Sequence, residues 1–205
     1  MTARGLAEFT LAETASMVGD GVARLVERAC TARGCAAQPT DIARFTDDYA
    51  AHAVVASLPY PGVVATLRDL RAAGWHLALC TNKPEAPARA LLAAFGLEGL
   101  FAAVGGGDSF PVRKPDPRHM LATLTAAGGA AARAVAVGDH ANDVTAATGA
   151  GLPCIFAAWG YGTPTMATGA AAVAQHFTEI PALAMDLLAG PVSLARPSGG
   201  RPGEP

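Results

Sequence analysis

Apolar and polar positions follow different patterns on the two sides of a proline- and glycine-rich stretch at residues 58–62. Before it, apolar residues recur at helical spacing, which predicts helices over residues 11–18, 22–29 and 40–53 and no strand. After it, short apolar runs alternate with helical patterns, which is typical of β-α-β units in a parallel sheet. We therefore expect a helical domain over residues 1–58 and an α/β domain over residues 59–190.

The α/β region divides into short strands and longer helices, most of which end at glycine or proline. The expected strands cover residues 75–80, 101–104, 134–137 and 153–158, and the expected helices cover residues 63–73, 84–95, 117–127, 142–148 and 180–188. The run AVAV before Gly138 has the composition of a strand that is buried on both faces. Residues 191–205 are rich in proline, glycine and arginine, which predicts a disordered tail.

Chemically active side chains follow the ends of the expected strands, and the carboxyl ends of parallel strands share one edge of a sheet. Thr81 and the amides that open the next helix could bind an anion. Lys114, between two prolines, supplies a cation, and Asp139 and Asp143 could hold Mg2+ through oxygen atoms. Trp159, Gly160 and the loop Gly105-Gly106-Gly107-Asp108 meet at the same edge. A hydroxyl, amides, a lysine and Mg2+ around one point describe a phosphoryl-transfer site.

Each of these residues also has a purely structural interpretation. Thr81, Asn82 or Asp139 could cap a helix, Asp143 could favour a helix dipole, and the three glycines could form only a tight turn. Lys114 alone would be an ordinary surface lysine, and Lys83 is expected to point into solvent from the start of a helix. The five histidines show no spacing typical of metal ligands. The order of the motifs and their shared edge favour the functional interpretation.

Composition restricts the class of partner. The net charge of −2 without a long basic run argues against nucleic acid or an anionic membrane as the main partner. No apolar run reaches the length of a membrane span, and the first residues lack the apolar middle of a signal peptide, so we expect a cytoplasmic protein. Cys80 and Cys154 are expected to be buried. Cys30 and Cys35 lack zinc-site spacing, and a disulfide between them stays open although a reducing compartment disfavours it.

Three motifs resemble those of a known family. CTNKP at residues 80–84, RKPDP at 113–117 and GDHANDV at 138–144 resemble the second, third and fourth motifs of the haloacid dehalogenase superfamily. Segments 17–29, 59–74 and 150–162 resemble its phosphoglycolate phosphatase branch. The resemblance implies a Rossmann-like parallel sheet under a small all-helical cap, and a phosphatase that uses Mg2+ and an aspartyl-phosphate intermediate.

The same resemblance implies roles for individual residues. Thr81 and the Asn82 amide would bind the transferring phosphoryl group, and Lys114 would neutralise its charge. Asp139 would ligate Mg2+, and Asp143 would hold the metal or its waters. The loop Gly19-Asp20-Gly21 would reach from the cap to the substrate and contribute to specificity.

The chain departs from the family pattern in one respect. The family's first strand ends in Asp-x-Asp-Gly-Thr, which carries the nucleophile and the general acid/base, and residues 1–205 contain no such motif. Asp20-Gly21 in the cap and Asp47-Asp48 in a helix cannot replace it. In the family this strand lies in the middle of the sheet, so we expect the nucleophile upstream of Met1, through a start placed too far downstream or a truncated gene. The chain expressed from Met1 should then be inactive and marginally folded.

Two functions therefore remain. The favoured one is an Mg-dependent phosphatase of a small phosphorylated metabolite, most directly 2-phosphoglycolate, whose nucleophile lies outside these residues. The alternative is a non-catalytic remnant of the same fold that binds a phospho-ligand or a protein. A haloacid dehalogenase is disfavoured because the Gly-Asp-x-x-x-Asp pair suits phosphate chemistry better. Monomer and homodimer both stay open.

Overall fold

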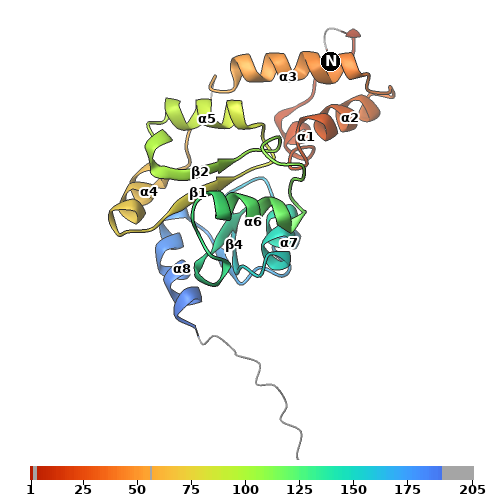
Figure 1. Cartoon of the computed structure of the whole chain (residues 1–205). Coiled ribbons are helices and arrows are strands. Elements are labelled where there is room, and N and C mark those ends of the chain that lie inside the picture. The colour runs from red at the N-terminus through yellow and green to blue at the C-terminus, as the bar shows by residue number, and fades with distance from the viewer. Residues whose placement is uncertain (2–3, 56, 191–205) are drawn as a thin grey trace, which may run out of the picture.

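The computed structural model describes residue 1, residues 4–55 and residues 57–190. They form a group of helices above an α/β body, with helix α3 lying over helix α5 (Figure 1). The expected disordered tail at 191–205 lies outside the described residues.

The N-terminal region contains the three expected helices, α1 (Leu11–Ala15), α2 (Val22–Ala32) and α3 (Pro39–His52). Helix α1 begins with a capping box, in which the Thr10 hydroxyl accepts from the Glu13 N–H and the Glu13 carboxylate accepts from the Thr10 N–H. Helices α2 and α3 pack against each other, and α3 also contacts α5 of the body. The cap is therefore attached to the body through α3 and through the loop that precedes α2.

The body alternates helices and strands as expected, and all of its strand pairs are parallel. Its elements are α4 (Val63–Ala72), β1 (Leu77–Cys80), α5 (Glu85–Ala94), β2 (Phe101–Gly105), α6 (Pro117–Ala126), β3 (Ala136–Gly138), α7 (Ala141–Gly149), β4 (Cys154–Ala157), β5 (Ala172–Ala174) and α8 (Ile180–Ala189). Short 3-10 turns connect several of them. Strand β5 was not expected, because three residues are too few to show a periodic pattern.

The strands form two sheets, β1-β2 and β3-β4-β5, and within the described residues no ladder joins β1 to β3. Helix α6 connects the two halves, since it packs on β1 and β2 and also on α7. The prediction that β3 is buried on both faces was wrong, because Val137 is 41% exposed. In the described part of the chain β3 pairs with β4 alone, so no neighbouring strand covers its other edge there.

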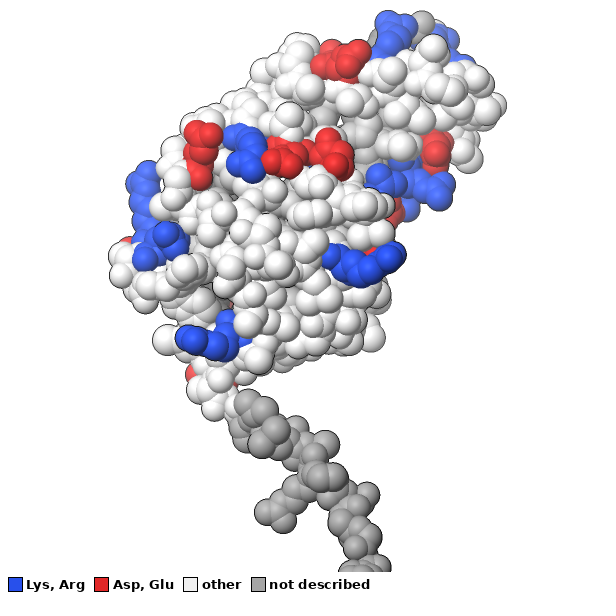
Figure 2. All heavy atoms as spheres, in the orientation of Figure 1, with Lys and Arg blue, Asp and Glu red and all other residues white. Residues whose placement is uncertain are grey.

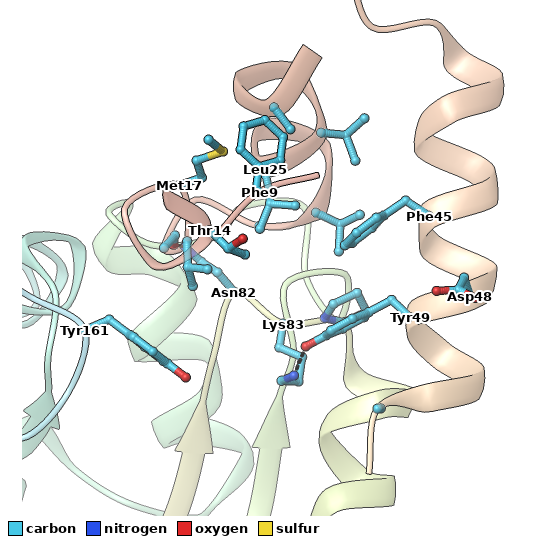
Figure 3. A pocket seen from close by; sticks show the side chains of 18 of the residues that line it. Phe9, Thr14, Met17, Leu25, Phe45, Asp48, Tyr49, Asn82, Lys83 and Tyr161 are labelled. Atoms are coloured by element: carbon cyan, nitrogen blue, oxygen red, sulfur yellow. Dashed lines mark hydrogen bonds between the residues drawn. The ribbon is translucent and has the colours of Figure 1, made fainter. Parts of the chain in front are cut away.

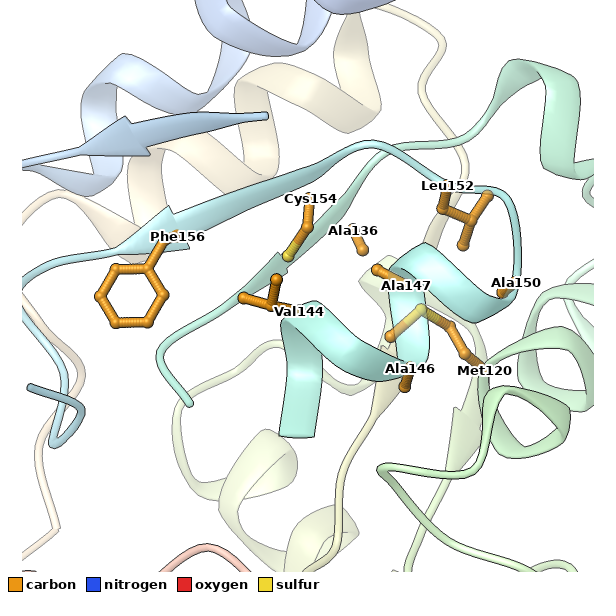
Figure 4. Close-up of a cluster of buried hydrophobic side chains, with 9 residues drawn as sticks. All are labelled: Met120, Ala136, Val144, Ala146, Ala147, Ala150, Leu152, Cys154 and Phe156. Carbon is orange, nitrogen blue, oxygen red and sulfur yellow. The ribbon is translucent and has the colours of Figure 1, made fainter. Parts of the chain in front are cut away.

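The best-packed part of the core surrounds β4, where all four residues are buried. Met120, Val144, Leu152 and Phe156 form one cluster with small residues of α7 and with β3 (Figure 4). Ala146 and Ala147 have no exposed surface, so α7 approaches the sheet closely. This packing fixes the position of the loop between β3 and α7.

Acidic and basic side chains are mixed on the face shown in Figure 2. None of the helices within residues 1, 4–55 and 57–190 combines the length and the apolar character needed to cross a bilayer.

Candidate functional site

The loop after β1 carries the first group of site residues. The Thr81 N–H extends the β1-β2 pairing to the Gly105 carbonyl at 2.8 Å, and the Thr81 hydroxyl accepts from the Lys83 N–H at 3.1 Å. Helix α5 begins at Glu85 with Pro84 as its N-cap, so neither Thr81 nor Asn82 caps it. The Glu85 N–H donates to the Asp108 carboxylate at 2.7 Å. The first amide of α5 is therefore already occupied by a carboxylate of the protein, and the loop after β1 stays the candidate site for the anion of a ligand.

Asn82 joins three segments of the chain. Its side-chain amide donates to the carbonyls of Gly19 and Lys114, both at 2.9 Å, and the residue is only 9% exposed. These two bonds fix the orientation of the amide group. The Oδ1 atom is buried and has no hydrogen-bond partner among the described residues. An acceptor left without a donor in this way is unfavourable and marks a place where a further group fits.

Lys114 points into the body rather than into solvent. Its ammonium donates to Asp143 Oδ1 and to the Cys80 carbonyl, each at 2.6 Å, and the two side chains of the pair are 10% and 9% exposed. His119 holds the backbone of this loop, because its Nδ1 accepts from the Lys114 N–H and its Nε2 faces the Gly106 carbonyl. Burial lowers the pKa of His119, which favours the neutral ring that these two bonds need.

The loop after β3 places the two expected carboxylates. His140, not Asp139, is the N-cap of α7, and Asp143 completes a capping box by accepting from the His140 N–H at 3.0 Å. Asp139 accepts from the Tyr161 N–H at 2.7 Å. A Cβ at Gly138 would lie 2.3 Å from the Asp143 carboxyl carbon, and one at Gly160 would lie 2.2 Å from an oxygen of Asp139. Glycine at both positions lets the backbone approach the carboxylates.

The cap loop reaches these residues directly. The Gly19 carbonyl accepts from Asn82 and from Asn142, and Asp20 accepts from Asn142 at 2.6 Å and pairs with Arg28. Burial disfavours the charged form of Asp20, but these two partners hold its pKa below its usual range. A Cβ on Gly19 would lie 2.7 Å from the His140 ring. The loop is therefore fitted against the strand ends.

A cavity of about 1100 Å3 lies between the cap and the strand ends. It brings together most of the predicted site residues: Gly19, Gly21, Thr81, Asn82, Lys114, Asp139 and Asp143. Thr81, Asn82, Lys114, Asp139 and Asp143 are called the core set below. Cap residues Phe9, Phe45 and Tyr49 face the same cavity (Figure 3).

The donor set fits a hydrated Mg2+ ion better than a fully protein-bound metal. No cluster of three acidic, histidine or cysteine side chains occurs in the part of the chain that the structure describes. Asp143 already engages both oxygens, with Lys114 and with the His140 N–H, whereas Asp139 accepts one hydrogen bond, from the Tyr161 N–H, among the described residues. Mg2+ commonly keeps several waters and uses one or two carboxylates together with substrate phosphate. Asp139 is the stronger candidate for a direct ligand.

One prediction about the site was wrong, and some contacts were missed. Lys83 does not point into solvent: it lies half-buried in the cavity, and its ammonium donates to the Tyr49 hydroxyl of α3 (Figure 3). His119 and Asn142 were not recognised as positioning residues. Asn142 lies inside the GDHANDV motif, so its place beside Asp139 could have drawn attention, whereas nothing local in the sequence connects Tyr49 or His119 to the site.

The comparisons with known proteins agree with this geometry. The model of the haloacid dehalogenase-like hydrolases matches residues 3–151. A phosphoglycolate phosphatase from Caulobacter vibrioides is 41% identical over 177 residues, which cover 84% of this chain and 75% of that protein. These matches confirm the resemblance inferred from the motifs.

Solved structures show the same fold. A predicted phosphoglycolate phosphatase from Haemophilus somnus superposes with a TM-score of 0.79 at 27% identity, over 89% of this chain and 85% of its own. CbbY from Rhodobacter sphaeroides, solved in complex with phosphate, superposes with a TM-score of 0.76 at 27% identity, over 91% and 88%. The α/β body with its helical cap is therefore shared with phosphatases.

Proposed function

Because this chain belongs to the haloacid dehalogenase-like hydrolase family, we propose that it forms most of an Mg-dependent phosphatase for a small phosphate ester, most directly 2-phosphoglycolate. The observation that carries the proposal is the convergence of the core set on one cavity that the cap covers. The name shared by curated relatives such as the Caulobacter protein supports this substrate.

The residues of the core set have complementary tasks. The Thr81 hydroxyl and the Asn82 N–H bind phosphoryl oxygens, and Lys114 supplies a fixed positive charge beside them. Asp143 holds the Lys114 ammonium in place through their 2.6 Å contact. Asp139 holds the Mg2+ ion, which would neutralise phosphate charge when bound. The cap limits the access of water to the reacting group.

The nucleophile of the proposed reaction belongs to a segment outside residues 1–205. Three observations favour this: β1 and β3 have no ladder between them in the described structure, Val137 of β3 is 41% exposed, and Asn82 Oδ1 lacks a donor. One further parallel strand would pair with both edges and bring a carboxylate to the core set. The 205 residues by themselves would bind phosphate but lack the nucleophile that forms the aspartyl-phosphate.

The same observations favour a second candidate, a non-catalytic protein that binds a phospho-ligand. Lys114, Thr81 and Asp139 can hold a phosphate group whether or not a nucleophile is present. In-frame DNA upstream of Met1 that encodes Asp-x-Asp-Gly-Thr would favour the phosphatase, and its absence would favour the binding protein.

The test is phosphate release from 2-phosphoglycolate with and without Mg2+. The assay compares residues 1–205 with a version extended by the in-frame upstream residues, and a third version replaces Lys114 by alanine in the extended protein. Mg-dependent turnover is expected only from the extended protein with Lys114 intact. If the extended protein releases no phosphate from any small ester, the phosphatase proposal is wrong.

A further inference from the structure

Lys83 lies in the wall of the cavity but outside the core set. It follows Thr81 by two residues, and its side chain is half-buried between the loop after β1 and the cap helix α3. Its ammonium donates to the Tyr49 hydroxyl and lies 4.4 Å from the centre of the Tyr49 ring. We call Lys83 and Tyr49 the cap contact.

The ammonium of the cap contact has no counter-ion. Among the ion pairs of residues 1, 4–55 and 57–190, none includes Lys83, whereas Lys114 is paired with Asp143. Burial lowers the pKa of Lys83, so a nearby negative charge would stabilise its charged form. Carboxylates such as Asp48 line the same cavity, but none of those described forms an ion pair with Lys83, so this half-buried cation is suited to an anion that arrives with the ligand.

Tyr49 is held in a defined position. Its ring stacks on Phe45 with 5.9 Å between ring centres, one turn earlier on the same helix. The ammonium and the phenol hydroxyl can each donate one hydrogen bond, which matches the two oxygens of a carboxylate. A dianionic phosphate would leave more charge uncompensated at this position, so the cap contact favours the smaller, singly charged group.

We infer that Lys83 and Tyr49 bind a carboxylate of the substrate, so that the site selects phosphate monoesters of small hydroxy acids. The inference rests on the proposed function, because it places the phosphate at Thr81 and Lys114. Thr81 and Lys83 are separated by one residue and line the same cavity, so one small ligand can contact both. Phosphate and carboxylate separated by one carbon, as in 2-phosphoglycolate, suit this spacing.

The experiment measures dissociation constants by titration calorimetry in the presence of Mg2+. The ligands are 2-phosphoglycolate and ethyl phosphate, which has a methyl group where the first has a carboxylate. The proteins are the 205-residue chain and its variants Lys83→Met, Tyr49→Phe and Arg44→Met, each checked for cooperative thermal unfolding. Arg44 lines the same cavity on the same helix, so it controls for the general effect of removing a positive charge.

We expect the unmodified chain to bind 2-phosphoglycolate about 10- to 100-fold more tightly than ethyl phosphate, the range of a charged hydrogen bond. Lys83→Met should remove most of this preference and leave the affinity for ethyl phosphate unchanged. Tyr49→Phe should remove part of the preference for 2-phosphoglycolate, and Arg44→Met should leave that preference unchanged. If Lys83→Met does not fold, the test rests on Tyr49→Phe, which should show a reduced preference for 2-phosphoglycolate over ethyl phosphate.

Equal affinity of the unmodified chain for the two esters would overturn the inference and leave the proposed function intact. An equal loss of preference in Arg44→Met and Lys83→Met would also overturn it, because the general field of the cavity would then select the carboxylate. Binding of neither ester by a chain that unfolds cooperatively would contradict both the proposed function and the inference.

Discussion

The two lysines of the chain face the same cavity but have different surroundings. Lys114 points into the body, where a carboxylate and a carbonyl each lie 2.6 Å from its ammonium. Lys83 points to the cap, where the Tyr49 side chain is the one hydrogen-bond partner of its ammonium among the described residues. The body thus carries a charge arrangement that is complete before a ligand binds, whereas the cap contact lacks an anion. From this difference we propose that the body carries the shared phosphate chemistry and that the cap contact selects the substrate.

The largest expected effect is the loss of stability when the buried pair is broken. Lys114→Met leaves Asp143 charged and buried, which should lower the free energy of unfolding by about 3–5 kcal/mol. The measurement is urea unfolding at neutral pH.

The double variant Lys114→Met with Asp143→Leu is the matched control, since it removes both charges. The double variant should regain most of the free energy of unfolding that the single variant loses. A single variant as stable as the unmodified chain would show that Lys114 is not buried as described.

A smaller effect should follow from protonation of His119. Burial keeps the pKa of His119 in the folded chain below its usual value of 6.5. Below about pH 6.5 this histidine therefore binds a proton more readily in the unfolded chain than in the folded one. The free energy of unfolding should then decrease as the pH falls. His119→Gln should lose this dependence and cost about 1–3 kcal/mol at neutral pH, because the Lys114 N–H loses its acceptor.

Urea unfolding at pH 7.5 and at pH 5.5, of both proteins, measures this contribution. Equal pH dependence in the chain and in His119→Gln would contradict the role of His119 in holding the Lys114 loop.

Asp139→Asn should reduce Mg2+ affinity by about tenfold, since it removes a charged ligand at a site with few others. Calorimetric titration with MgCl2 in the presence of phosphate measures the change. Asp108→Asn is a suitable control, because that carboxylate binds the start of α5 instead. Unchanged affinity in Asp139→Asn would exclude Asp139 as the ligand.

The smallest effect on stability is expected at the cap contact. Lys83→Met replaces an unpaired cation with an apolar side chain of similar length, so the free energy of unfolding should change by less than about 0.5 kcal/mol. The same urea experiment measures it beside Lys114→Met. If Lys83→Met lowered the free energy of unfolding as much as Lys114→Met, the two lysines would not differ in their contribution to stability, and this prediction would be wrong.

Much of this arrangement could be predicted from the sequence. Helical and strand patterns placed each long element, and the motifs at 80–84, 113–117 and 138–144 identified the core set, because such signals are local. The burial of β3 was predicted wrongly, since a strand pattern records composition and not whether both neighbouring strands are present. Strand β5 was too short to recognise.

The cap contact could not be predicted for a different reason. Lys83 and Tyr49 are 34 residues apart, and their meeting depends on how α3 lies over α5. A lysine at the start of a helix is usually solvated, so its local sequence gave no reason to place it in a cavity. Contacts between cap and body depend on the tertiary arrangement, and one sequence does not record it.

The most direct test of the division between body and cap contact is the binding of inorganic phosphate, which carries no carboxylate. The dissociation constant is measured by calorimetry, in the presence of Mg2+, for the chain and for its variants Thr81→Val, Lys114→Met and Lys83→Met. We predict that Thr81→Val and Lys114→Met weaken phosphate binding by about tenfold or more, whereas Lys83→Met leaves it unchanged. Thr81→Val preserves shape, so it carries the test even if Lys114→Met is unstable. Loss of phosphate binding in Lys83→Met, with full binding in Thr81→Val, would contradict the account.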